Sequence, residues 1–237
     1  MTEWKAKRFW KETRVAEAEG GWQVLLDGRP VRTPLKSAMI LPTVQMAEAV
    51  AAEWDAQEGV IDPLSMPVTR SANAAIDKVS IQHAEVAAML AAYAETDLLC
   101  HRAEAPKELA EQQNKGWDPV LTWAAETYSA PLAVVAGILP AVHSEKSLST
   151  YASIVKGFRP FSLTALHDLI TLSGSLLLGL GVANGKIDPN EAWRLSRIDE
   201  DWQISQWGED EEATEAAEIK RNAFLHAANF LRLAQGT

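Results

Sequence analysis

The strongest constraint on the fold is an apolar run in the second half of the chain. It reads LTALHDLITLSGSLLLGLGV and extends from residue 163 to residue 182. A run of this length must be buried in a protein core or in a bilayer. His167 and Asp168 lie inside it, and a charge is costly at the centre of a membrane. We therefore predict one long, buried core helix over residues 163–182, with a membrane-spanning helix as the alternative.

A change in hydrophobic periodicity divides the chain. The first third has short alternating apolar runs, interrupted by Gly20-Gly21 and by Asp27-Gly28, and Asp-Gly in this setting is typical of a tight hairpin turn. Residues 42–57 are helical in pattern, and beyond about residue 71 the pattern is almost wholly helical. We predict an α+β protein with a small β-rich N-terminal domain, residues 1–75 with one helix, and a larger all-α domain, residues 76–237.

Glycine, proline and capping residues predict where individual elements begin and end. Gly116 and Asp118-Pro119 are expected to divide residues 107–129 into two helices, and Ser80 is expected to cap the helix after it. Residues 60–70 contain two prolines and are expected to connect extended segments. The last two helices are expected over residues 189–207 and 210–233.

Composition argues against several kinds of site. The formal net charge is -10, whereas a nucleic-acid-binding surface needs clustered lysine and arginine. The five histidines form no pair at metal-ligand spacing, no G-x-S-x-G motif occurs, and the single cysteine excludes an internal disulfide. The glycine-rich residues 179–185 close a helix rather than open one, so they do not predict a phosphate site. We expect no nucleic-acid partner, cofactor, metal, small-molecule substrate or catalytic residue.

Residues 196–212 read SRIDEDWQISQWGEDEE and combine seven acids with two tryptophans. Asp188, Pro189 and Glu191 form a start signal for the helix that contains them, and Gly208 forms its stop. On one continuous helix, two opposed sides would be apolar, the first with Leu195, Ile198 and Trp202 and the second with Trp193, Ile204 and Trp207. Such a helix lies between two layers or keeps one side for a partner.

The acids of this segment are not equivalent. Glu200 falls within the second apolar side, where a carboxylate needs a partner. That partner is Arg197, three residues earlier, or a cation on another protein. Asp199, Asp201 and the acids at 209–212 are expected to be solvated.

Four blocks of the chain resemble a known protein family. They are GGWQVLLDGRPVRTP, AVAAEWDAQEGVIDPLSMPVT, YAETDLLCHRAEAPKELAEQQNKGWDPVLTWA and LSRIDEDWQISQWGEDEEA. Their order and spacing resemble the assembly chaperones of the F-type ATP synthase that handle the α subunit of its catalytic head. The resemblance covers nearly the whole chain, from about Phe9 to Leu233.

The resemblance implies a chaperone without catalytic activity. Such a protein binds the unassembled α subunit and prevents its misassociation until the β subunit displaces it. The positions that carry over to partner binding are Trp54 and the acidic-aromatic segment, with Glu200 or Asp201 as the key acid and Trp193, Trp202 and Trp207 beside it. Trp54 shares a helix face with Ala47 and Val50, so a core position is its alternative interpretation. Mitochondrial members carry a targeting extension, and its absence here implies a bacterial, cytoplasmic member.

Two other functions remain open at this point. The acids near Glu200 could serve a small-molecule enzyme, although no motif supports one. The apolar run at 163–182 could anchor a membrane-associated factor.

Overall fold

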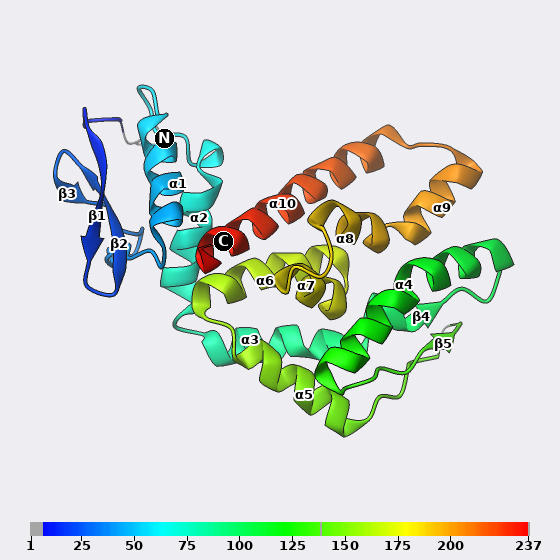
Figure 1. Ribbon diagram of the computed structural model, residues 1–237. Helices are drawn as coiled ribbons and strands as arrows, with labels where there is room; N and C mark the ends of the chain where they lie inside the picture. Colours follow the sequence, from blue (N-terminus) through cyan, green and yellow to red (C-terminus); the bar gives the residue numbers. More distant parts are fainter. Residues whose placement is uncertain (1–6, 138, 237) are drawn as a thin grey trace. The chain divides into compact units, whose positions relative to one another are not determined.

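The computed structural model describes residues 7–137 and 139–236, and they form two compact units (Figure 1). The first unit contains the described residues up to His83, together with Arg159–Ala165 and the residues from Asn229 onward. The second contains Ala84–Phe158 and Leu166–Ala228. The predicted domain boundary after residue 75 stays a prediction.

The first unit is built on a three-stranded antiparallel sheet. Its strands are β1 (Thr13–Ala18), β2 (Gly21–Leu26) and β3 (Arg29–Pro30), in the order β1-β2-β3. The hairpin between β2 and β3 turns at Asp27 and Gly28, whose φ angles of 48° and 77° are both positive. Two positive φ angles are what the tightest hairpin turn requires, so the predicted Asp-Gly turn is confirmed.

Two helices accompany the sheet, where the sequence predicted one. They are α1 (Val44–Asp55) and α2 (Pro67–Ala74), and a short 3₁₀ helix, Pro63–Ser65, comes between them. The prediction that residues 60–70 connect extended segments was therefore wrong. The residue before α2 gives it no side-chain cap. Instead, the Glu53 carboxylate accepts hydrogen bonds from the backbone N–H groups of Val68 and Thr69, each at 2.7 Å. A carboxylate on another helix therefore supplies this cap, and local sequence does not reveal it.

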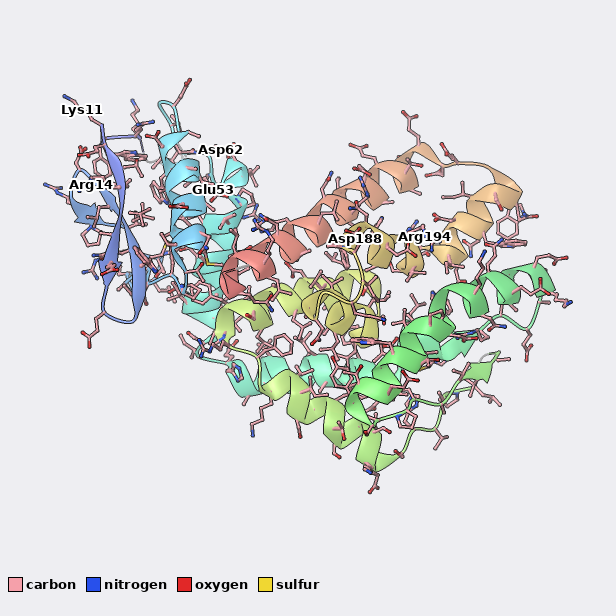
Figure 2. All side chains as sticks on the ribbon, viewed as in Figure 1. Lys11, Arg14, Glu53, Asp62, Asp188 and Arg194 are labelled. Atoms are coloured by element: carbon pink, nitrogen blue, oxygen red, sulfur yellow. The ribbon has the colours of Figure 1, made fainter. Side chains whose placement is uncertain are left out.

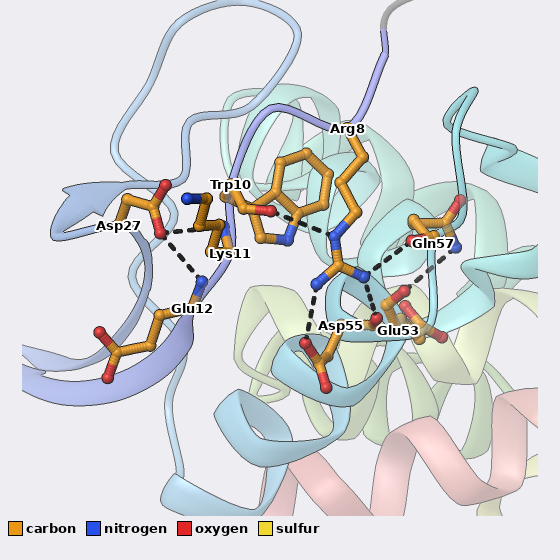
Figure 3. A network of polar contacts seen from close by, with 8 residues as sticks. All are labelled: Arg8, Trp10, Lys11, Glu12, Asp27, Glu53, Asp55 and Gln57. Atoms are coloured by element: carbon orange, nitrogen blue, oxygen red, sulfur yellow. Dashed lines mark hydrogen bonds and ion pairs between the residues drawn. The ribbon is translucent and has the colours of Figure 1, made fainter.

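Hydrogen bonds from Arg8 join the N-terminal segment to the C-terminal end of α1 (Figure 3). The Arg8 guanidinium donates hydrogen bonds to the carbonyl oxygens of Asp55 and Gln57, and it lies 3.2 Å from the Asp55 carboxylate. A cation beside the last carbonyls of a helix stabilises that end. The Trp10 ring is buried and packs edge-on against the half-buried Trp54 ring, with 5.2 Å between the ring centroids.

The second unit is mainly helical. Its elements are α3 (His83–Ala91), β4 (His101–Arg102), α4 (Lys107–Tyr128), β5 (Val135–Ala136), α5 (Glu145–Lys156), most of α6 (Pro160–Ser173), α7 (Leu176–Ala183), α8 (Pro189–Ser196), α9 (Ile198–Trp207) and the larger part of α10 (Glu211–Gln235). Ser80 does not cap α3; its hydroxyl bonds back to Ile76 after a π-helical turn, Ala75–Val79. The strands β4 and β5 pair in parallel.

The apolar run at 163–182 is buried as predicted, but it forms two helices. Gly174, with φ of +69°, and Ser175 separate α6 from α7. The Asp97 carboxylate is fully buried beside this break. It accepts hydrogen bonds from the Ser175 hydroxyl at 2.7 Å and the Leu177 N–H at 3.0 Å. The Ser175 hydroxyl in turn accepts a hydrogen bond from the Leu178 N–H at 3.0 Å, so a local cap and a distant acid together satisfy the start of α7. The Gly174-Ser175 pair was a local signal for this break that the sequence prediction passed over.

The sequence predicted two helices over residues 107–129, whereas the structure has one, α4. It runs unbroken from Lys107 to Tyr128 through Gly116 and Pro119. Proline removes one helical hydrogen bond, and Pro119 lies on the exposed side, where water can reach the freed carbonyl. Gly116 is needed for packing, because a β-carbon there would lie 2.8 Å from the Ile198 side chain.

The predicted fold class, a small N-terminal β region followed by helices, is confirmed. Across residues 7–137 and 139–236, none of the helices combines the length and apolar character that a bilayer-spanning segment requires.

Candidate protein-docking site

The acidic-aromatic segment begins on a well-capped helix, α8. Figure 2 labels Asp188, just before this helix, and Arg194, within it. Asp188 accepts hydrogen bonds from the backbone N–H groups of Asn190 and Glu191, and Pro189 occupies the first helical position, as predicted. Arg194 then forms two hydrogen bonds to Glu191, at 2.6 and 2.7 Å. This contact lowers the pKa of Glu191 and raises the pKa of Arg194, because each charge favours the other.

The chain does not continue from α8 as one helix, which corrects the prediction for residues 189–207. Arg197, with φ and ψ of -109° and 6°, ends α8 and precedes α9. Leu195 and Ile198 flank this break and are buried. The indole N–H of Trp117 donates to the Leu195 carbonyl at 2.8 Å, which helps hold the end of α8 against α4. The helical-wheel positions predicted across Arg197 therefore do not apply.

A groove of about 650 Å³ lies along α8, α9 and the first turns of α10. Trp193, Ile204 and Trp207 contribute apolar surface from α8 and α9, and Ala213 and Ala217 contribute it from α10. Trp193 is buried at 8% exposure and packs against Phe224, with 5.7 Å between ring centroids. Trp207, by contrast, is 80% exposed. The groove therefore has a fixed aromatic base and one large apolar side chain open to solvent.

The structure brings together four of the six predicted partner-binding residues. Trp193, Glu200, Asp201 and Trp207 all line the groove. Trp202 does not line it and is half-buried on α9. Trp54 belongs to the first unit, where its ring packs against Trp10. The partner-binding role of all six residues stays a prediction.

The charges in the groove are unequally compensated. Each arginine that lines it already has a carboxylate partner: Arg194 with Glu191, Arg197 with Glu200 at 3.0 Å, and Arg221 with Glu218 at 3.2 Å. Among the described residues, Asp201 and Glu209 form no ion pair, although both line the groove and the charge of Asp201 helps raise the pKa of Arg194. Five acidic side chains line the groove against three arginines. The uncompensated charge of the groove is therefore negative.

The acids next to Glu200 have different surroundings. Asp199, expected to be solvated, is half-buried and accepts a hydrogen bond at 2.6 Å from the buried Gln113 side chain. Asp201 is exposed, as expected. In the part of the chain that the structure describes, no three histidine, cysteine or acidic side chains gather where they could hold a metal ion.

Sequence reasoning missed the contribution of α10. Ala213 and Ala217 lie one turn apart on the helix face that lines the groove, and Glu218 and Arg221 continue that face. The four-residue spacing of the two alanines was a visible signal. It gains meaning only once the chain is seen to turn back between α9 and α10 (Figure 1), so that both helices line the groove.

Solved structures share this architecture, and one of them is described as a putative chaperone. The crystal structure of Atp12 from Paracoccus denitrificans is 50% identical, covers 98% of this chain and 100% of its own, and superposes with a TM-score of 0.96. An aspartate-to-lysine point mutant of the same protein gives the same TM-score and coverage at 49% identity. A structure from Agrobacterium tumefaciens, described as a putative chaperone, is 39% identical with a TM-score of 0.89, over 95% of this chain and 85% of that one.

The particular family follows from the sequence comparison. The family described as ATP12 chaperone protein matches residues 7–125. The mitochondrial protein atp12 of Schizosaccharomyces pombe is 24% identical over 225 residues, which cover 88% of this chain and 76% of the relative. The chain belongs to the ATP12 chaperone family, the ATP synthase assembly chaperones that its sequence blocks resemble.

Proposed function

We propose that this protein binds the unassembled α subunit of the F-type ATP synthase head and prevents its misassociation until the β subunit displaces it. The observation that carries the proposal is Trp207, 80% exposed at a groove whose uncompensated charges are acidic. A large exposed aromatic side chain bordered by charge is typical of an interface anchor. Membership of the ATP12 chaperone family supplies the class of client.

The groove suits a contact that must be reversible. Apolar burial against Trp207 and Ile204 supplies affinity, while the acids at its edge set the orientation of the client and speed its encounter. In this proposal the protein acts in the bacterial cytoplasm, without catalysis, cofactor, nucleic acid or small-molecule substrate.

The test is co-purification from cells that produce the tagged protein with either the α or the β subunit. We expect the α subunit to be retained and the β subunit not. Failure to retain an α subunit that is itself soluble would overturn the proposal.

A further inference from the structure

The groove beside Trp207 has features that specify the kind of segment it binds. This inference rests on the proposed function, because the segment is taken to be part of the client. The first feature is the lack of packing on the groove's walls. Within α10, the residues from Glu211 to Lys220 are all exposed except Ala217, which is half-buried, and within α9 only Ile198 is buried.

Such helices are short of the contacts that normally stabilise a helix. Most of the stability of a protein helix comes from packing of an apolar face rather than from local propensity. The start of α10 has only a local cap, in which the Ala213 N–H donates to the Asp210 carboxylate at 2.8 Å. The apolar side chains of α9 and α10 therefore form a surface that a further element could complete.

The shape of this surface favours a helix as that element. The groove is bounded by three helices, α8, α9 and α10, whose backbone groups are bonded within the helices themselves. An extended segment would find no strand edge there for its own backbone hydrogen bonds, whereas a helix satisfies them internally. The small side chains of Ala213 and Ala217 allow close approach to α10, and Trp207 faces the same space from α9.

The charges that line the groove specify the sign of the charge that the bound segment carries. Arg194, Arg197 and Arg221 each form an ion pair, and Arg194 also feels the charge of Asp201, which helps raise its pKa. Five acidic side chains nevertheless line the groove against these three arginines, and neither Asp201 nor Glu209 is in an ion pair among the described residues. Glu211 and Glu212 follow directly and are exposed. A segment with lysine or arginine beside its apolar stripe complements this pattern, and an acidic segment is repelled by it.

We propose that the groove binds one basic amphipathic helix of the client, with its aliphatic stripe against Trp207, Ile204 and the two alanines. Its lysine or arginine side chains pair with Asp201 and Glu209. Binding buries Trp207 and packs the exposed first turns of α10.

The probe is a synthetic peptide of about 18 residues, long enough to be helical, with leucine and alanine on one face and lysine on the other. Its controls are a scrambled peptide of identical composition and a peptide with glutamate in place of lysine. We expect the amphipathic lysine peptide to bind the full chain at least tenfold more tightly than either control. Equal binding of the scrambled peptide would reduce the contact to nonspecific charge attraction and overturn the inference.

Matched variants locate the binding. Trp207→Ala and the double variant Asp201→Lys with Glu209→Lys should each weaken peptide binding at least tenfold. Glu215→Lys changes an equally exposed acid of α10 that does not line the groove, and it should leave binding within about twofold. Equal effects of the double variant and Glu215→Lys would contradict the assignment to this groove.

Measuring how much α subunit the groove variants and the unaltered protein retain distinguishes a failure of this inference from a failure of the proposed function. We expect the lysine peptide to displace the α subunit and the groove variants to retain less of it. If the groove variants retain the α subunit fully, the inference is overturned and the proposed function stands. If the unaltered protein retains none, both are overturned.

Discussion

At the scale of single residues, Glu200 combines an internal contact with a place in the groove. Its carboxylate lies 3.0 Å from Arg197, which is also 5.9 Å from the centre of the Trp193 ring. The Glu200 side chain is 46% exposed, so the pair stabilises the fold by about 1 kcal/mol at most. Arg197 therefore satisfies Glu200 without removing it from the surface, and the two alternatives that the sequence left open are compatible.

Reversing the charge of Glu200 distinguishes a role of this residue in stability from a role in α-subunit capture. We expect Glu200→Lys to weaken α-subunit capture at least tenfold and to lower the free energy of unfolding by about 1 kcal/mol or less. Urea unfolding and a quantitative pull-down measure the two effects, with Glu215→Lys as the control. A folded variant with undiminished capture would remove Glu200 from the docking surface, and a variant that does not fold would make the ion pair structural.

Trp54 is a predicted partner residue that packs inside the first unit. Its half-buried ring packs on the buried Trp10 ring, and the Trp10 carbonyl accepts a hydrogen bond from Arg8. We expect Trp54→Ala to lower the free energy of unfolding by about 2–4 kcal/mol, somewhat less than the roughly 3–5 kcal/mol for a fully buried tryptophan, because the ring is half-buried. Chemical denaturation measures this change. A stability loss below about 0.5 kcal/mol together with lost α-subunit capture would instead identify Trp54 as a contact residue.

At the scale of elements, the sequence predicts those that depend on local signals. The Asp27-Gly28 turn, the Asp188 cap and a helix over residues 42–57, observed as α1 over Val44–Asp55, were all predicted, because the residues that specify them lie within or beside them. The breaks in helices were predicted poorly. Ser175 caps α7 locally, and its place after Gly174 was a signal that the prediction passed over. The Asp97 carboxylate, eighty positions away, also accepts from the start of α7, and Glu53 on another helix caps α2. Contacts of this kind exist only in the folded chain.

Asp97 makes the junction of α6 and α7 sensitive to pH. Burial raises the pKa of its carboxyl from 3.8 to about 6, against the hydrogen bonds from Leu177, Ser175 and Leu99, which lower it. Between about pH 4 and pH 6 the folded chain therefore holds a proton on Asp97 that the unfolded chain has released. The stability that this group contributes is fully present below about pH 4 and is lost as the pH rises through about 6.

An Asp97→Asn variant isolates this contribution, because it lacks the titrating group. We expect the stability of the unaltered protein, relative to that of the variant, to fall by on the order of 2–3 kcal/mol as the pH rises from about 4 to 7. Urea unfolding of both proteins across this range measures the difference. A difference that stays constant with pH would contradict the raised pKa.

At the scale of the whole molecule, the sequence predicted the fold class and the family, because the four blocks extend over most of the chain. It predicted the groove only in part. Glu200, Asp201, Trp193 and Trp207 were predicted to lie at a docking surface, and all four line the groove. The predicted continuous helix was wrong, because Arg197 interrupts it and so changes how Trp193 on α8 lies relative to the residues of α9. The wall formed by Ala213 and Ala217 depends on the return of the chain after Gly208, which no local pattern specifies.

The central claim is that this protein binds the unassembled α subunit and prevents α subunits from associating with one another until the β subunit arrives. Light scattering coupled to size-exclusion chromatography tests it most directly, with isolated α subunit alone, with an equimolar amount of this protein, and after addition of β subunit. We predict self-associated α subunit in the first sample, a discrete complex in the second, and release of this protein from α in the third. Unchanged self-association of α in the second sample, or a complex that β does not disrupt, would contradict the account.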